Sequence, residues 1–115
     1  MTRLRISSVI GFATCCLLSM THVALAADAQ RGEETYLRVG CWQCHGYAAQ
    51  GASTGPKLAP DPLPVEVIRE KLRVAGDRMP PYREAVLSDD EIADIHAYLE
   101  TIPPPPRLED TILGQ

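Results

Sequence analysis

The chain has 115 residues and a formal net charge of −4, and 45% of its residues are hydrophobic. This length suits one small domain with a modest core, and a domain of that size needs a staple to be stable. The acidic balance disfavours a nucleic acid as partner.

Residues 1–26 have the pattern of an export signal. Arg3 and Arg5 give a basic start, a mostly apolar stretch covers 9–20, and Ala24-Leu25-Ala26 fits the small-x-small cleavage rule. We expect cleavage after this tripeptide and export to the periplasm. The apolar stretch is short for a transmembrane helix, which favours a signal over a membrane span. After cleavage, no membrane insertion is expected. An uncleaved N-terminal anchor is the alternative interpretation.

Three helices are predicted in the rest of the chain, over 28–39, 64–75 and 88–101. Asp28, Pro64 and the Ser88–Glu91 capping box mark their starts. Apolar residues recur at helical spacing in the last two. These stripes are Val65, Ile68, Leu72 and Ala75, then Ile92, Ile95, Leu99 and Ile102.

Glycine and proline mark the segments between and after these helices. Gly32 lies inside the first predicted helix, where glycine is unfavourable, so we expect a close helix crossing there. The segments 46–62 and 77–87 are predicted loops, and a long loop in a small domain usually has a function. Four prolines from Pro103 end the last helix, so 103–115 is predicted as a Pro-rich tail that is mobile or docked on a partner.

The run Cys41-Trp42-Gln43-Cys44-His45 is the attachment signature of c-type haem. Two thiols three positions apart can each bond one vinyl group of the same porphyrin, and the histidine that follows can bind the iron. We therefore predict one covalent haem c per chain, with Cys41 and Cys44 as anchors and His45 as an axial ligand. The bound haem is also the staple that this small domain needs.

Other interpretations of the run are weaker. A thioredoxin-like redox pair belongs at the junction of a strand and a helix in a βαβ pattern, which the surrounding sequence lacks. A structural zinc site needs further ligands, and the only other histidine after residue 26 is His96. A chance match in an exported chain is the third alternative.

Met79 is the predicted second axial ligand. It is the only methionine after residue 26 and stands in a loop before Pro80-Pro81, whereas a methionine that fills a core more often lies on a helix stripe. A Met/His pair raises the reduction potential relative to two nitrogen ligands. His96 is the competitor, although a histidine on a helix face is more often structural or solvated.

Taken together, the chain resembles a small monohaem class I cytochrome c of a bacterial periplasm. The matching elements follow the family's order over nearly all of 27–102. They are Gly32 and Tyr36, the run from Cys41 to Gly46, Gly55-Pro56-Lys57-Leu58, Met79-Pro80-Pro81-Tyr82, and the segment from Leu87 to Leu99.

The resemblance implies an all-α cytochrome c fold, with three to four short helices around the haem. It implies that the first helix crosses the last near Ile95 and Tyr98. It further implies that the Pro56 carbonyl accepts a hydrogen bond from the His45 ring and that Leu58 packs on the haem. The Pro-rich tail is not an element that the family shares.

One-electron transfer is the expected function, because two axial ligands leave the iron no open site for a substrate. We therefore expect a protein that is not itself an enzyme, with a redox protein as donor and another as acceptor. A monomeric carrier is expected first, and a subunit of a larger dehydrogenase or oxidase complex is the alternative. A haem protein that binds a ligand at an open iron site is a third possibility, against which Met79 argues.

Overall fold

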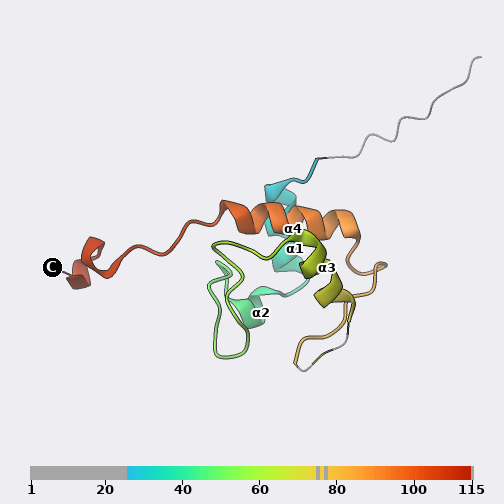
Figure 1. The fold of residues 1–115 in the computed structure, drawn as a ribbon, viewed down its shortest axis with the longest axis horizontal. Coiled ribbons are helices and arrows are strands. Elements are labelled where there is room, and N and C mark those ends of the chain that lie inside the picture. The colour runs from blue at the N-terminus through green and yellow to red at the C-terminus, as the bar shows by residue number, and fades with distance from the viewer. Residues whose placement is uncertain (1–25, 75, 77, 115) are drawn as a thin grey trace, which may run out of the picture.

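The computed structural model describes residues 26–74, 76 and 78–114. Its described part is all-α, as predicted, and the predicted export signal lies outside that part except for Ala26. The α-helices are α1 (Ala29–Arg38), α2 (Trp42–His45), α3 (Val65–Arg73) and α4 (Asp89–Thr101) (Figure 1). Within the described residues, no helix is long and apolar enough to span a membrane.

The predicted helices are present, although α3 ends two residues earlier than predicted, and capping side chains begin α1 and α4. The Asp28 carboxylate accepts from the Arg31 amide and begins α1. Ser88 and Glu91 form both hydrogen bonds of the capping box that begins α4. Pro64 stands one position before α3 as its N-cap residue, and not inside the first turn.

Helix α1 crosses α4 at Gly32, and this crossing is the main packing contact between helices. A Cβ atom at Gly32 would overlap the Asp94 carbonyl group and would lie 2.9 Å from the Ile95 amide nitrogen. One turn further along α1, the rings of Tyr36 and Tyr98 lie 5.6 Å apart. The absence of a side chain at Gly32 therefore lets the two backbones touch, which explains an otherwise unfavourable glycine.

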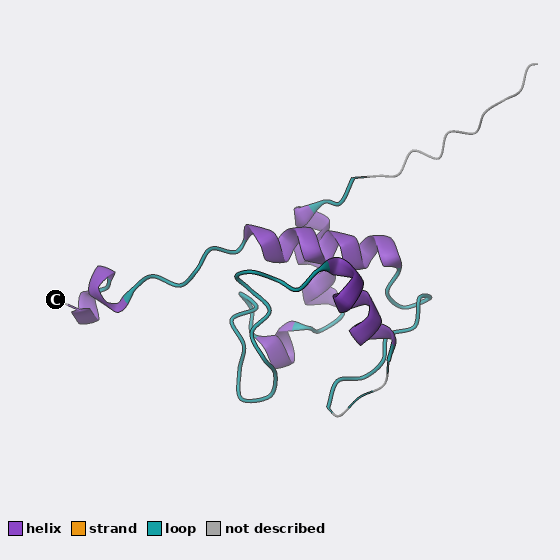
Figure 2. Ribbon diagram, in the orientation of Figure 1, coloured by secondary structure: helices purple, strands orange, loops and turns teal. Residues whose placement is uncertain are grey.

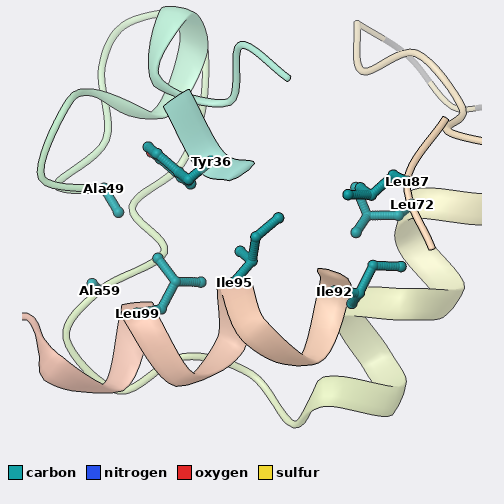
Figure 3. Packing of buried hydrophobic residues seen from close by; sticks show 8 residues of the cluster. All are labelled: Tyr36, Ala49, Ala59, Leu72, Leu87, Ile92, Ile95 and Leu99. Carbon is teal, nitrogen blue, oxygen red and sulfur yellow. The ribbon is translucent and has the colours of Figure 1, made fainter. Parts of the chain in front are cut away.

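The core lies along one side of α4 (Figure 3). Ile92, Ile95 and Leu99 point the same way from this helix and are almost fully buried. Leu72 of α3 and Leu87 of the following loop lie near Ile92, at one end of the row. The other members of the core are Tyr36, Ala49 and Ala59. Helix α4 therefore connects α1, α3 and both long loops.

Two loops fill the space between the helices, and the tail extends away from the domain. The loops follow α2 and α3, and in Figure 2 both lie on the same side of the α1–α4 pair. The tail has no regular secondary structure at 102–107, and it ends in two 3₁₀ turns that the sequence did not predict, at Leu108–Asp110 and Ile112–Gly114.

A network of charged side chains connects α1 and α4 on the solvent side of their crossing. The Asp94 carboxylate accepts from the Arg31 guanidinium at 2.9 and 3.0 Å and from the Asp28 amide. Burial alone would raise the pKa of Asp94, but these hydrogen bonds outweigh it and lower the pKa below its ordinary value of 3.8. Ionised Asp94 therefore stabilises the crossing above that pH.

We expect Gly32→Ala to lower the free energy of unfolding by about 1–3 kcal/mol, the usual cost of forcing an extra methyl group into a packed contact. Urea denaturation followed by circular dichroism measures this change. Glu33→Ala, on the exposed side of the same turn, is the matched control and should be nearly neutral. Equal stability of the two variants would contradict the close crossing.

We expect the contribution of Asp94 to be complete above pH 4 and to be lost as the pH falls through its lowered pKa. Asp94→Asn should therefore cost about 1–2 kcal/mol at pH 7, and this difference from the wild type should shrink towards pH 2. Thermal unfolding between pH 2 and 7 measures it. Asp90→Asn, at an exposed position of the same helix, is the control. A cost that does not change with pH would contradict the assignment.

Candidate haem-binding site

The haem-attachment motif forms a helix of its own. Cys41 is the N-cap residue of α2, and its carbonyl accepts from the amide of His45 at 3.0 Å. Gly46 ends this helix at φ 80°, a conformation that only glycine adopts easily. One short helical turn therefore carries both thiols and the histidine.

His45 is buried, and a single backbone contact decides that its Nδ1 carries a proton. Its Nδ1 lies 2.7 Å from the carbonyl oxygen of Pro56, the contact that the resemblance implies. A carbonyl oxygen only accepts hydrogen bonds, so Nδ1 must carry the proton. In the neutral ring, Nε2 is then the unprotonated nitrogen with a lone pair for a metal.

The loop after α2 folds back closely over the motif. A Cβ atom at Gly55 would lie 2.8 Å from the Cys44 carbonyl oxygen and 3.1 Å from His45 Nδ1. The Thr54 hydroxyl donates to the same Cys44 carbonyl at 3.3 Å. The missing side chain at Gly55 therefore lets Pro56 reach the imidazole, which gives the Gly-Pro dipeptide a local reason.

Both thiols of the motif are free. Cys44 is exposed and Cys41 is partly buried. Burial raises the pKa of the Cys41 thiol to about 11, whereas the thiols of dithiol redox proteins have lowered pKa values. In the described part of the chain, no group of three Cys, His, Asp or Glu side chains is placed to hold a metal ion, as a zinc site would require.

A set of apolar side chains that are only partly buried packs against the core, and Cys41 and Trp42 of the motif belong to it. Leu58 packs against the core, and its amide donates to the Ala49 carbonyl at 2.8 Å. The other partly buried apolar residues packed on the core are Val39, Cys41, Trp42, Val65, Ile68, Tyr82, Tyr98 and Ile102. Two free thiols on one helical turn and an imidazole with an available Nε2, next to partly buried apolar side chains of the motif itself, fit a covalently bound haem.

Tyr36 supports the motif in a way that the sequence did not predict. Its hydroxyl donates to the Gly46 carbonyl at 2.7 Å, and its side chain is fully buried. Burial raises the pKa of this phenol, so it stays a donor at any physiological pH. The residue after His45 is therefore tied to α1, close to the crossing with α4.

Trp42 of the motif forms an aromatic pair with the exposed Tyr47. The rings of Trp42 and Tyr47 stack with centroids 4.5 Å apart and an angle of 16° between their planes. The Trp42 indole donates to the Leu37 carbonyl at 3.2 Å, and 64% of Tyr47 is exposed. Trp42, the unusual residue within the motif, is thus held by α1 and covered by the next loop.

Met79 lies on a loop, whereas the motif lies on helix α2. This loop follows α3, and 38% of the Met79 side chain is exposed. The competitor His96 lies on α4, where its Nδ1 is 3.6 Å from a Glu100 carboxylate oxygen one turn away. The structure therefore brings Cys41, Cys44, His45 and Pro56 together, while the role of Met79 stays a prediction.

We expect Gly55→Ala to disturb His45, because the added methyl group would press on its ring nitrogen and on the Cys44 carbonyl. The cost should be about 1–3 kcal/mol of folding free energy, together with weaker haem incorporation. Denaturation and the haem-to-protein absorbance ratio of the purified protein measure the two effects. Ser53→Ala, at an exposed position of the same loop, should change neither. Normal stability and haem content of Gly55→Ala would contradict the contact.

Comparisons with known proteins show which family the chain is similar to. A family model described as "Cytochrome C oxidase, cbb3-type, subunit III" matches residues 27–99, more than half of the chain. A protein named "Cytochrome bc1 complex cytochrome c subunit" from Corynebacterium diphtheriae is 33% identical over 78 residues. That alignment covers 65% of this chain but only 27% of the relative. No solved structure matches the chain significantly.

Proposed function

Because the chain belongs to the cytochrome c family whose family model matches residues 27–99, we propose that it is a one-electron carrier of the periplasm with His/Met-ligated haem c. Family membership makes it a haem protein of electron transport. The ligand pair, the covalent attachment through Cys41 and Cys44 and the compartment are our proposals.

The observation that carries the proposal is the buried His45 ring. Its contact with Pro56 fixes the tautomer and the ring orientation, which is how proteins prepare a histidine for a metal. Gly46, Tyr36 and Gly55 hold the backbone on both sides of this ring. A preset imidazole needs little rearrangement when the charge of the bound metal changes.

Haem, when bound, supplies an iron that alternates between ferric and ferrous states. The residues of the chain set how easily it does so. Apolar neighbours such as Leu58 exclude water, and the Met79 thioether is a soft neutral donor that favours the reduced state. With both axial positions filled, the protein passes electrons between redox proteins and transforms no substrate.

Replacement of Met79 tests the ligand assignment. In Met79→Ala we expect the ferric protein to lose the weak far-red band that a methionine sulfur gives on haem iron, and the reduction potential to fall. We also expect the ferrous variant to bind carbon monoxide at neutral pH, since the iron then has an open position. Optical spectra and a redox titration measure these changes.

His96→Ala is the matched control and should leave the spectra and the potential unchanged. An unchanged spectrum of Met79→Ala would contradict the proposal and would point to another sixth ligand or to an open iron. Loss of the far-red band in His96→Ala alone would assign the ligand to α4.

A second candidate function is that of a subunit in a larger redox complex. The tail favours it, because its two 3₁₀ turns expose Leu108, Ile112 and Leu113, each at least 66% accessible. The matched family and the relative from Corynebacterium diphtheriae are both named as subunits of such complexes. The free carrier stays the first proposal, because the site itself needs no further subunit.

Native extracts separate these two functions. A free carrier should elute from size exclusion at the mass of a single domain, with or without residues 103–115. A complex subunit should elute at a much larger mass, and deletion of 103–115 should return it to the single-domain mass with an unchanged haem spectrum. N-terminal sequencing of the same protein tests export, since it should begin at Ala27 if the signal is cleaved after Ala26.

A further inference from the structure

The loop that carries Met79 is fastened at its far end by one side chain, that of Arg73. This residue ends α3, and only 25% of its side chain is exposed. Its Nη1 donates to the carbonyl oxygens of Tyr82 and Leu87, both at 2.9 Å. One guanidinium nitrogen therefore bridges two points of the loop that lie five residues apart.

The other nitrogen of this guanidinium fixes the bridge to the start of α4. Nη2 of Arg73 pairs with the Asp89 carboxylate, and Asp89 is the first residue of that helix. A planar fork of donors suits this task, because it reaches two carbonyls and a carboxylate from one rigid group. Arg73 thus joins the end of α3, the loop and the start of α4.

The clamped segment connects directly to both sides of the haem site. Tyr82 stands three residues after Met79, and its amide donates to the Leu72 carbonyl at 2.7 Å. Its hydroxyl donates to the Val39 carbonyl at 3.4 Å, two residues before Cys41. The position of Tyr82 therefore sets the distance between the Met79 loop and the haem motif, and Pro80-Pro81 stiffens the connection to Met79.

We propose that Arg73 is a positioning residue for Met79: by clamping the Tyr82 and Leu87 carbonyls it holds the methionine sulfur at the iron. This inference rests on the proposed His/Met ligation. A thioether is a weak ligand that an external molecule can displace, so the strength with which the loop is held decides how far the sixth position is protected. Arg73 would act through the backbone carbonyls of Tyr82 and Leu87 and not as a ligand itself.

Arg69 provides a matched control for this role. It lies one turn earlier on α3, and its Nε is 3.2 Å from the other carboxylate oxygen of Asp89. Arg69 thus shares the helix, the charge and the acidic partner of Arg73, but the loop carbonyls are bonded to Arg73. Arg73→Lys and Arg69→Lys make the same chemical change, and both keep a positive charge for Asp89.

The experiment compares carbon monoxide binding by the ferrous holoproteins of the wild type, Arg73→Lys and Arg69→Lys. Lysine has a single nitrogen, which cannot take the positions of both Nη1 and Nη2, so we expect Arg73→Lys to bind carbon monoxide about tenfold more tightly or better. Its ferric far-red band should weaken as well. Arg69→Lys should match the wild type in both measurements.

Limited digestion with trypsin gives a readout that does not depend on haem chemistry. Both substitutions keep the number of trypsin sites, and Arg83 lies exposed inside the clamped segment. Cleavage after Arg83 should be faster in Arg73→Lys than in Arg69→Lys. The inference would be overturned if the two variants were cleaved by trypsin at equal rates and bound carbon monoxide with equal affinity. This holds whether both affinities match the wild type or both rise by the same factor.

The wild type separates this inference from the proposal on which it rests. A wild-type protein that lacks the far-red band and binds carbon monoxide readily would refute Met79 ligation, and the role of Arg73 would fall with it. A wild type with the band and with weak carbon monoxide binding, accompanied by an unaltered Arg73→Lys, would refute the role of Arg73 alone.

Discussion

The contact of two backbones at Gly32 is the constraint on which the rest of the molecule depends. Because α1 and α4 meet without an intervening side chain, Tyr36 comes within reach of both Tyr98 and the Gly46 carbonyl. The crossing thereby fixes the end of α2, and with it the orientation of His45. A change of a few tenths of an ångström at the crossing would therefore be felt at the candidate haem site, although no residue of the crossing is a predicted ligand.

The candidate site has two halves, one around His45 and one around Met79, and they are held in different ways. The half around His45 is held by contacts with the backbone of Pro56, Gly55 and Gly46, which stand next to the motif or on the loop that follows it. The half that carries Met79 is held by side-chain bonds from Arg73 and Tyr82, and the Tyr82 hydroxyl reaches Val39, 43 residues away in the sequence. This difference suits a cofactor that is attached covalently on one side and only coordinated on the other.

The parts that the sequence predicts are those with local causes. Helices α1 and α4 begin where they do because Asp28 and Ser88 provide capping side chains next to them in sequence, whereas α3 begins after Pro64, which makes no capping hydrogen bond. Helix α2 was missed, since four residues without a side-chain cap give no periodic signal. The roles of the Tyr36 hydroxyl and of Arg73 were also missed, because their partners are particular carbonyl oxygens that only the folded chain brings near.

The tail has a consequence for the kinetics of electron transfer. Four prolines from Pro103 form a stiff spacer of about 12 Å at polyproline rise, which separates the exposed apolar tip from the domain. If the tip binds a neighbouring protein, the encounter of the two redox centres becomes intramolecular, at an effective concentration set by the length and stiffness of the spacer. The domain would then separate from its partner and meet it again without diffusing away. The length of the proline run would set the rate of electron transfer between the two proteins.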